Sequence, residues 1–467
     1  MQFSQHKLLI ANRGEIAVRI INAAQQLGIP TIAICSEADR LSLPSLLADE
    51  VEVIGASRAD QSYLNADLVI ETAKRLGATA IHPGYGFLSE NADFAEAVEQ
   101  AGMIFVGPDA ATIRQMGDKA CARTTAQAAG VPVVPGSDGE IDSIEEALTA
   151  AQTIGYPLLI KASAGGGGRG IRIAHNKEEL VKEITIAQSE AKAAFGSGAV
   201  YLERFIKSAR HIEVQILGDG KQAIHLYERE CSLQRRRQKV FEEAPSPALS
   251  NAIREQLCAT AAKLANTLNY KGAGTLEFLF DAETEEFFFI EMNTRIQVEH
   301  PVSEMITGVN IVEWMIKIAL GEPLTLCQDE INIHGCAIEM RINAEDPSKG
   351  FFPSPGRISA LHWPVNEGVR IDTHVFDGYT IPPYYDSLIA KLIVHDVSRE
   401  LAFERALKSL KQTRIEGIKT TLPLHRLLLQ DPAVQSGDFD TETLEVWLKE
   451  HSHRLADKEK AHASTAD

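Results

Sequence analysis

The sequence of 467 residues is poor in cysteine and aromatic side chains, and it has fewer positive than negative charges. Six cysteines stand apart with no CxxC pair, which argues against structural zinc and a disulfide framework. We find no signal-peptide pattern and no apolar run able to span a bilayer, so we expect a cytoplasmic protein. Lys and Arg number 46 against 64 Asp and Glu. The net charge of −18 argues against nucleic acid or an anionic membrane as partner.

The first 115 residues alternate between segments typical of strands and helices. Lys7–Asn12 and Ile29–Cys35 read as short apolar strands, and Gly14–Leu27 between them has helical periodicity. Such an order predicts a parallel sheet flanked by helices. The loop Asn12–Glu15 lacks the glycine triplet of a dinucleotide site, so we do not expect bound NAD in this domain.

A row of polar side chains at residues 291–299 carries the strongest chemical signal. The residues just before it, 287–290, read as a strand buried on both faces, so an extended backbone would turn the row inward. Burying unpaired charge is costly, and such a row must either pair internally or hold ions and charged ligands, which we favour. Its members are Glu291, Asn293, Arg295, Gln297 and Glu299.

Two strands before and after Thr284 read as a hairpin. A register symmetric about that residue would place Glu277 beside Glu291, and a divalent cation would remove the repulsion between the two carboxylates. Glu277, Glu291 and Asn293 offer the hard oxygen ligands that Mg²⁺ prefers, with substrate phosphates completing its shell. A slip of one residue in the turn would separate the carboxylates.

Two further segments are suited to anions. A strand ends at Lys161 and is followed by the glycine-rich run 165–170, which predicts a hairpin that closes over polyphosphate, although a merely flexible surface loop would have the same composition. The basic cluster 234–240 would place Arg237 and Lys239 on one strand face, where they could hold small anions. A solvated basic face is the alternative for its other arginines.

The ordered motifs together resemble the biotin carboxylase branch of the ATP-grasp superfamily over about residues 5–446. The resemblance rests on IANRGEIAVRI (10–20), HPGYGFLSEN (82–91), MGDK (116–119), KASAGGGGRG (161–170), ERECSLQRRRQKV (228–240), EMNTRIQVEHPV (291–302), RINAED (341–346) and GYTIPPYYDS (378–387). It implies a chain of mixed α/β and α+β class in three parts. These would be a Rossmann-like N-terminal domain at 1–115, an ATP-grasp domain at 116–325 with a mobile lid at about 134–205, and a C-terminal α+β domain at 334–446. A polar tail at 451–467 is expected to fray.

The resemblance also implies an activity. Such a ligase carboxylates biotin on a carrier protein, using bicarbonate and MgATP, through carboxyphosphate. Acetyl-CoA carboxylase is the expected host, and carboxylases of propionyl-CoA, pyruvate, 2-oxoglutarate or urea are alternatives. A non-catalytic ATP-binding regulatory subunit is the alternative from another class. Two Mg²⁺ or Mn²⁺ ions and a homodimer are expected. The absence of a Met-Lys-Met motif places the biotin carboxyl carrier protein and the carboxyltransferase on separate chains.

The family's functional residues carry over onto matching positions of this sequence. Nucleotide contacts would come from Lys119, Lys161, Gly165, Gly166, Gly167, Gly168, Glu203, Arg204, Phe205, Ile206, His211, Gln234 and Arg237, with Glu277 and Glu291 acting through the first metal ion, and Glu291 and Asn293 serving the second. Bicarbonate would lie against Lys239, Arg295, Gln297 and the backbone of Val298, with Glu299 as its base. Arg341 would stabilise the enolate-like oxygen of biotin, which Tyr85 would contact. Arg237 departs from the histidine of many relatives, and Arg204 from a common lysine.

Overall fold

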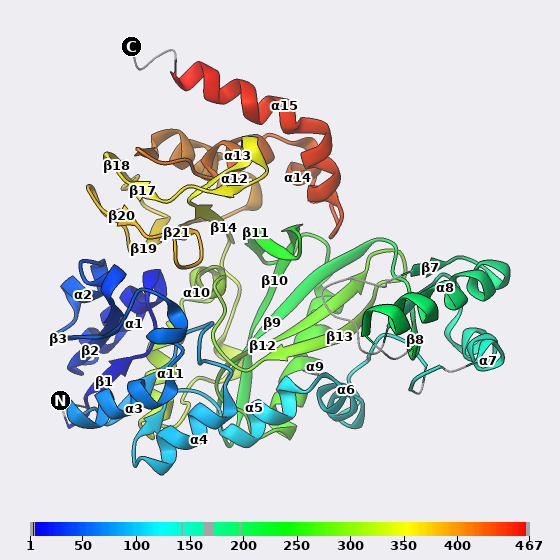
Figure 1. The fold of residues 1–467 in the computed structure, drawn as a ribbon, viewed down its shortest axis with the longest axis horizontal. Helices are drawn as coiled ribbons and strands as arrows, with labels where there is room; N and C mark the ends of the chain where they lie inside the picture. Colours follow the sequence, from blue (N-terminus) through cyan, green and yellow to red (C-terminus); the bar gives the residue numbers. More distant parts are fainter. Residues whose placement is uncertain are drawn as a thin grey trace. The chain divides into compact units, whose positions relative to one another are not determined.

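The structure, a computed structural model, describes residue 3 and residues 5–137, 139–141, 143–162, 172–195 and 198–463. The chain forms two compact units. The first consists of residues 1–131, 210–278 and 291–467, and the second of residues 132–209 and 279–290. Figure 1 follows the chain through both.

A parallel five-stranded sheet in the order β3-β2-β1-β4-β5 opens the first unit, which confirms the expected alternation. Leu8 and Ile10 of β1 belong to one apolar core and Leu9 to another, as expected for a sheet covered on both faces. The elements of this part are β1 (Leu8–Ile10), α1 (Gly14–Gln26), β2 (Thr31–Ser36), α2 (Leu43–Leu47), β3 (Glu50–Gly55), α3 (Ala66–Arg75), β4 (Ala80–His82), α4 (Ala92–Gln100), β5 (Ile104–Phe105), α5 (Ala110–Gly117) and α6 (Lys119–Ala128).

An eight-stranded sheet in the order β13-β12-β9-β10-β11-β14-β21-β19 carries seven of the site residues predicted above, namely His211, Gln234, Lys239, Glu277, Glu291, Asn293 and Arg341. The neighbouring positions of β12 and β13 confirm the hairpin predicted around Thr284. The strands are β9 (Ala209–Asp219), β10 (Ala223–Arg235), β11 (Gln238–Ala244), β12 (Lys271–Asp281), β13 (Glu286–Asn293), β14 (Cys336–Asn343), β19 (Val369–Thr373) and β21 (Leu388–Asp396). Helices α9 (Asn251–Thr267), α10 (His300–Thr307) and α11 (Ile311–Ala319) accompany them.

The expectation of one extended segment through residue 299 is wrong. Strand β13 ends at Asn293, the chain turns, and α10 begins at His300 with Pro301 in its first turn. Proline favours that place because the first N–H groups of a helix have no partner within it. A turn and a helix start, rather than one strand face, therefore direct Arg295, Gln297 and Glu299.

The C-terminal part packs small sheets and helices on the far end of the large sheet. It contains β15 (Glu345–Asp346), β16 (Phe352–Pro353), β17 (Gly356–Arg357), β18 (Ala360–His362), β20 (Thr380–Ile381), β22 (Arg414–Glu416), α12 (Arg399–Gln412), α13 (Leu422–Leu428), α14 (Pro432–Ser436) and α15 (Thr443–Ala463). The segment expected to fray from His451 is instead helical as far as Ala463. The reason is burial, since Trp447 and Leu455 belong to the C-terminal core.

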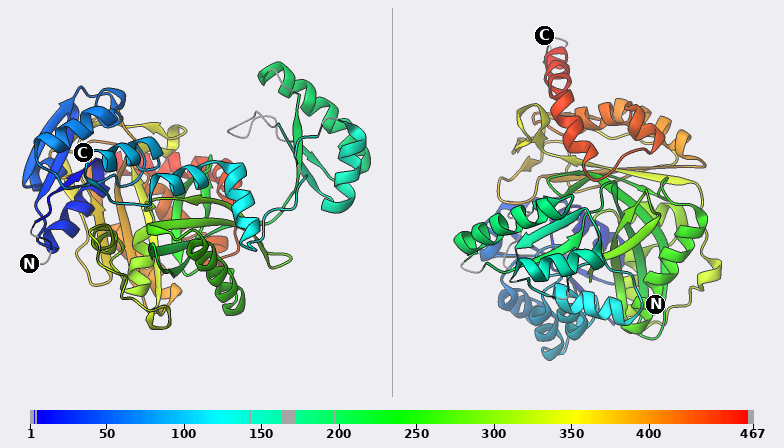
Figure 2. Two further views of the ribbon diagram at one scale, coloured as in Figure 1. Left: turned by 90° about the horizontal axis from the view of Figure 1, so that it is seen from below. Right: turned by 90° about the vertical axis from the view of Figure 1, so that its right-hand side faces the viewer.

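The second unit contains a three-stranded sheet in the order β7-β6-β8. Strands β6 (Leu158–Ala162) and β7 (Arg172–Ala174) pair antiparallel, which confirms strands on both sides of the predicted glycine-rich hairpin. Residues 163–171, including the glycine run, lie outside the described residues. Helices α7 (Ile144–Ile154) and α8 (Lys177–Phe195) cover one face of the sheet, and β8 (Val200–Arg204) completes it (Figure 2).

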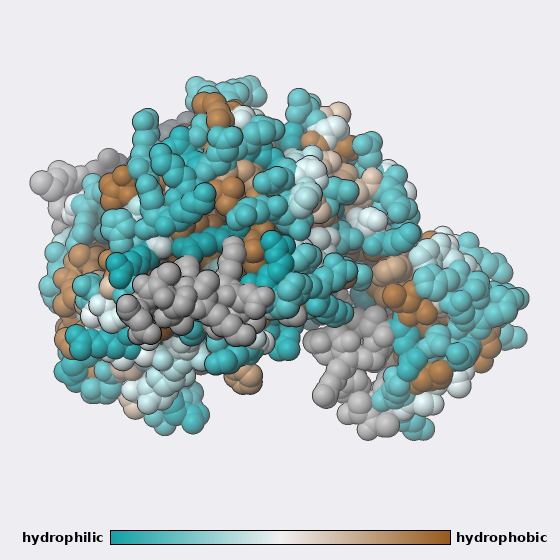
Figure 3. All heavy atoms as spheres, turned by 90° about the horizontal axis from the view of Figure 1, so that it is seen from above, coloured by the Kyte–Doolittle hydropathy of each residue, from teal (hydrophilic) through white to brown (hydrophobic). Residues whose placement is uncertain are grey.

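One face of the molecule is mostly polar. Hydrophilic residues cover most of the face in Figure 3, with hydrophobic residues scattered among them. Among the residues that the structure describes, no helix combines the length and the apolar character needed to cross a membrane. All six cysteines are free, as expected for a protein without a disulfide framework.

Candidate active site

A cavity of about 740 Å³ in the first unit gathers many of the predicted site residues. Strands β9 to β14, the loop after β13 and the loop after β4 contribute to its lining. The predicted residues that line it are Tyr85, His211, Gln234, Arg237, Lys239, Glu277, Glu291, Asn293, Arg295, Gln297, Val298, Glu299 and Arg341. These residues come from sequence positions more than 250 residues apart, and the fold brings them to one place.

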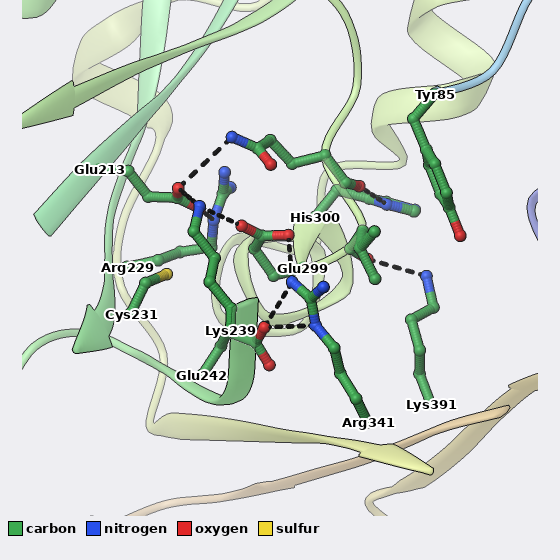
Figure 4. A network of polar contacts seen from close by, with 12 residues as sticks. Tyr85, Glu213, Arg229, Cys231, Lys239, Glu242, Glu299, His300, Arg341 and Lys391 are labelled. Atoms are coloured by element: carbon green, nitrogen blue, oxygen red, sulfur yellow. Dashed lines mark hydrogen bonds and ion pairs between the residues drawn. The ribbon is translucent and has the colours of Figure 1, made fainter. Parts of the chain in front are cut away.

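Lys239 lies among three carboxylates, of which Figure 4 shows those of Glu213 and Glu299. Its Nζ atom lies 2.5 Å from Oε2 of Glu213, 3.0 Å from Oε1 of Glu277 and 2.6 Å from Oε1 of Glu299. Burial lowers the pKa of Lys239, but the carboxylates raise it more, so the pKa lies well above its ordinary value. The lysine is therefore a permanent positive charge at neutral pH, held where an anion could reach it.

Glu299 is fully buried and contacts a second cation. Its Oε2 atom accepts a hydrogen bond from Nη2 of Arg341 at 2.9 Å. Burial raises the pKa of Glu299, but Lys239 and Arg341 lower it more, so the pKa lies well below its ordinary value. Arg341 also donates from Nε to Oε1 of Glu242 at 2.6 Å, and burial raises the pKa of Glu242 to about 7 despite that contact.

Glu277 contacts side chains from β13, from the loop after it and from β9. Its Oε1 atom accepts from Asn293 at 3.0 Å and from Gln297 at 2.9 Å, and its Oε2 lies 3.1 Å from Nε2 of His211. Burial raises the pKa of Glu277, but Lys239 and then His211 lower it to well below its ordinary value. This carboxylate remains ionised at neutral pH.

Glu291 differs from Glu277 because its side chain is 38% exposed. Within the described part of the chain, its one ion pair is to Lys119, whose Nζ lies 3.5 Å away. Glu291 thus presents carboxylate oxygens to the cavity with little protein around them. A second set of possible metal donors, which the sequence did not suggest, joins His211, Glu213 and Glu277 within 4.8 Å of one another.

Arg295 is oriented by the loop that follows β4. Its Nε atom lies 2.9 Å from Oε2 of Glu90, its Nη2 donates to Oδ1 of Asn293 at 2.9 Å, and its Nη1 donates to the carbonyl of Ile296 at 3.1 Å. Every guanidinium nitrogen is therefore positioned, which fixes the plane that a bound anion would meet. Sequence analysis did not identify Glu90 as a partner.

The structure does not bring every predicted residue to the cavity. Lys119 is not among its lining residues, and its side chain is 86% exposed. Lys161 and the segment Glu203–Ile206 belong to the second unit, where Lys161 forms an ion pair with Glu203. Arg204 pairs there with Glu286 at 2.7 Å. The predicted contacts Gly165, Gly166, Gly167 and Gly168 lie outside the described residues.

Several buried charged residues around the cavity escaped sequence analysis. Arg229 is fully buried and donates to Glu213, Gln215 and Ser303, so it supports the carboxylate that holds Lys239. A pattern in the sequence could have indicated this site, because polar His211, Glu213 and Gln215 alternate with buried aliphatic residues along β9. The others are Glu15, Glu242, Glu339 and Lys391, all buried.

Family models match nearly all of the chain. Residues 4–113 match the model described as biotin carboxylase, N-terminal domain, and residues 339–446 match the biotin carboxylase C-terminal domain. Residues 118–327 between them match the carbamoyl-phosphate synthase L chain, ATP binding domain. The order of these matches follows the order of the motifs along the sequence.

Individual relatives cover the chain almost from end to end. Biotin carboxylase 1 of Bacillus subtilis (strain 168) is 52% identical over 442 residues, which is 94% of this chain and 98% of the relative. The biotin carboxylase domain dimer of Hydrogenobacter thermophilus 2-oxoglutarate carboxylase, solved with MgADP, ADP and bicarbonate, is 50% identical, with a TM-score of 0.85 and coverage of 96% and 98%. The biotin carboxylase subunit of a pyruvate carboxylase is also 50% identical, with a TM-score of 0.88 and coverage of 96% and 99%.

Proposed function

The chain belongs to the biotin carboxylase family, and from that premise we propose that it performs the first half-reaction of acetyl-CoA carboxylase. In that reaction biotin on a carrier protein is carboxylated by bicarbonate, while ATP is cleaved to ADP and phosphate. The observation that carries the proposal is the juxtaposition of Lys239, Arg341 and Glu299 beside the acidic groups Glu277 and Glu291 in one cavity. Cations for an anion, a buried carboxylate base and oxygen ligands for a metal ion are all present.

The donor set suits a hard divalent cation. Glu277, Glu291 and Asn293 line the cavity together, and Glu291 has exposed carboxylate oxygens beside a lysine at 3.5 Å. We infer that these residues hold Mg²⁺ or Mn²⁺, as two ions. The ions would neutralise charge on the phosphates of ATP. The relative solved with MgADP supports this assignment.

The proposed ATP contacts are those that the family resemblance implies. We assign ATP contacts in the first unit to Lys119, His211, Gln234 and Arg237, of which Gln234 and His211 lie 3.1 Å apart. The contacts in the second unit are assigned to Lys161, Gly165, Gly166, Gly167, Gly168, Glu203, Arg204, Phe205 and Ile206. The lid assignment, about residues 134–205, rests on the glycine run between β6 and β7.

The anion subsite follows from the charges. Lys239, Arg295, Gln297 and the backbone of Val298 would hold bicarbonate, whose planar oxygens suit a guanidinium. Lys239 is paired with Glu299 here, so a bound anion would compete for the ammonium group. The pKa of Glu299 would then rise towards its ordinary value, because a neutralising cation has been shared. Anion binding would thus make Glu299 a more effective base.

The chemical steps follow from those positions. Glu299 removes the proton of bicarbonate as the bicarbonate oxygen attacks the γ-phosphorus of ATP, which gives carboxyphosphate and ADP. Carboxyphosphate decomposes to CO₂ and phosphate, a base takes the N1 proton of biotin, and N1 then attacks the carbon of CO₂ to give carboxybiotin. Arg341 stabilises the negative oxygen that develops on biotin, and Tyr85 contacts the biotin ring.

The proposal extends to the partners and the oligomeric state of the chain. The biotin carboxyl carrier protein and the carboxyltransferase would be separate chains, and the subunit would be a cytoplasmic homodimer. The dimer of the Hydrogenobacter thermophilus biotin carboxylase domain supports that oligomeric state. We further propose that the chain has three domains, at 1–115, 116–325 and 334–446.

Other acceptors remain a second candidate because of the solved relatives. Structures named for 2-oxoglutarate carboxylase and for pyruvate carboxylase are as similar to this chain as the curated biotin carboxylases are. Since the acceptor binds the carboxyltransferase, the cavity described here serves any of them. The regulatory alternative is disfavoured by the complete set of charged groups around Glu299.

The first experiment measures ADP release from MgATP with bicarbonate and free biotin each present or absent. Release that needs bicarbonate and is stimulated by biotin is expected. ATP binding with no release under any of these conditions would contradict the proposal. Supplying the carrier and carboxyltransferase of acetyl-CoA carboxylase, and in parallel those of a pyruvate or 2-oxoglutarate carboxylase, then tests the host. The acetyl-CoA carboxylase set should be used best, with malonyl-CoA as the product, and faster turnover with another set would favour that host.

A further inference from the structure

A series of polar contacts connects Tyr85, the proposed biotin contact, with Val298, whose backbone is the proposed bicarbonate contact. The hydroxyl of Tyr85 donates to Oε1 of Glu15. The other oxygen of Glu15, Oε2, lies 3.1 Å from Nζ of Lys391. Lys391 in turn donates from Nζ to the backbone carbonyl of Val298 at 2.9 Å. The series thus runs from the predicted biotin contact to the predicted bicarbonate contact.

The two charged members of this series are out of contact with water. The side chain of Lys391 is 0% exposed and that of Glu15 is 1% exposed. Oε2 of Glu15 has no hydrogen-bond partner among the described residues, so the ion contact to Lys391 is its main compensation. Lys391 has a second ion contact, to Oδ2 of Asp372 at 3.6 Å, and Asp372 is itself paired with Arg370 at 2.7 Å. The carboxyl group of Glu339 also acts electrostatically on Lys391. Burying such a pair costs desolvation free energy, which is repaid only by close contact and by further hydrogen bonds such as the one to Val298.

Strand β21 and helix α1 bring the side chains of this series together. Lys391 lies directly opposite Arg341 across the β14–β21 ladder, so both side chains share one face of the large sheet. Figure 4 shows Lys391 approaching the loop that carries Glu299 from the side on which Tyr85 lies. Glu15 lies in the first turn of α1. Just before it, Nδ2 of Asn12 donates to the carbonyl of Tyr85 at 2.7 Å.

We propose that Glu15 and Lys391 are positioning residues that hold Tyr85 and the Val298–Glu299 peptide in a fixed relation, so that the biotin and bicarbonate subsites are coupled. This inference rests on the proposed function. The carbonyl of Val298 and the amide of Glu299 belong to one planar peptide group, so a donor that fixes the carbonyl also fixes the amide. Without Lys391 that carbonyl loses its buried donor, and the backbone beside the catalytic base can rotate.

A purely structural pair would behave differently. Losing it would lower the melting temperature and leave the KM values of the folded enzyme unchanged. A positioning pair changes the KM for bicarbonate even when the fold is intact. The double variant Glu15→Gln/Lys391→Met separates these roles, because it removes both buried charges together and leaves Asp372 with Arg370. Glutamine at 15 also keeps an oxygen for the Tyr85 hydroxyl.

The experiment compares the double variant with the wild-type enzyme in bicarbonate-dependent ADP release. We expect a melting temperature near that of wild type, a KM for bicarbonate raised about tenfold, as expected for the loss of a hydrogen bond from a charged donor, and an unchanged KM for MgATP. The matched control is Glu243→Gln/Arg399→Met. In that pair Glu243 is fully buried and Arg399 is 17% exposed, with Nε of Arg399 at 2.7 Å from Glu243. The pair does not line the cavity, so every KM should stay at the wild-type value.

A folded double variant with the wild-type KM for bicarbonate would overturn the inference and leave the proposed function standing. A wild-type enzyme with no bicarbonate-dependent release would overturn the proposed function, and this inference with it. If the double variant fails to fold, Tyr85→Phe replaces it, because that change removes only the hydroxyl at the start of the series. Coupling then requires a raised KM for bicarbonate as well as for biotin, and an unchanged KM for bicarbonate would refute it.

Discussion

Arg341 connects two buried carboxylates, with Nη2 at 2.9 Å from Oε2 of Glu299 and Nε at 2.6 Å from Oε1 of Glu242. The pKa values of these two carboxyl groups move in opposite directions. Burial raises that of Glu242 to about 7, whereas Lys239 and Arg341 outweigh burial and hold that of Glu299 well below its ordinary value. Neighbouring groups whose pKa values are driven apart are typical of sites that transfer protons.

Glu299→Gln should lower the turnover number at least about a hundredfold, the usual contribution of a general base. The fold should persist, because Lys239 keeps Glu213 and Glu277, and Arg341 keeps Glu242. The rate of bicarbonate-dependent ADP release gives the turnover, and thermal melting checks the fold. A folded variant with the wild-type rate would remove Glu299 from the mechanism.

Arg295→Ala should lower kcat/KM for bicarbonate roughly ten- to a hundredfold, since it deletes a charged donor from the anion subsite. Arg295→Lys should recover only part of this loss, because an ammonium group cannot keep the separate contacts to Glu90 and Asn293 that orient the guanidinium. Initial rates at varied bicarbonate measure both variants. Full recovery in the lysine variant would show that charge alone is sufficient.

Glu291→Gln should raise the Mg²⁺ concentration needed for half-maximal ADP release, because one anionic oxygen ligand becomes an amide. Stability should change little, since the Glu291 side chain is 38% exposed and its ion pair to Lys119 is 3.5 Å long. The control is Glu285→Gln, an exposed position in the turn between β12 and β13. Identical Mg²⁺ dependence in Glu291→Gln and wild type would contradict the metal assignment.

Glu339→Gln should stabilise the protein at pH 8 by about 1.4 kcal/mol for each pH unit by which the fold raises the pKa of Glu339, because the amide has no proton to lose. Neither carboxylate oxygen of Glu339 has a hydrogen-bond partner among the described residues, and burial raises its pKa well above the ordinary 4.5.

The sign of that change follows from the raised pKa. The folded wild-type protein keeps a proton on Glu339 that the unfolded chain releases above about pH 4.5, so its stability falls as the pH rises above that value. Glutamine mimics the protonated form at every pH. Urea denaturation at pH 5 and pH 8 should therefore show a larger advantage for the variant at pH 8, and an advantage independent of pH would contradict the expected titration.

Truncation after residue 450 should destabilise the protein by about 2–5 kcal/mol, because it removes Leu455, whose side chain is 2% exposed in the C-terminal core. Truncation after residue 463 removes only residues beyond the end of α15 and serves as the control. Melting temperatures compare the two. Equal stability of both truncated proteins would mean that the helix beyond residue 450 contributes nothing to the core.

Local patterns in the sequence were sufficient for much of the fold. The strands expected within Lys7–Asn12 and Ile29–Cys35 and the hairpin around Thr284 were predicted correctly, because the periodicity of apolar residues and the polar turn are both properties of neighbouring residues. The extended row through Glu299 was not, since a turn and a helix start replace the strand after Asn293. The prediction of a frayed tail from His451 was also wrong, because a mostly polar segment can still be held by one buried side chain, here that of Leu455.

The sequence by itself determined which side chains carry the chemistry, since carboxylates, guanidinium groups and a lysine at inward positions can be stable only with a charged partner or ligand. Only the tertiary structure decided which partner each one has. Lys239, Glu299 and Arg341 are separated by at least 42 residues and meet through neighbouring strands and the start of a helix. The contact between Glu15 and Lys391 could not be predicted either, because the sequence does not show which group folding places beside a buried charge.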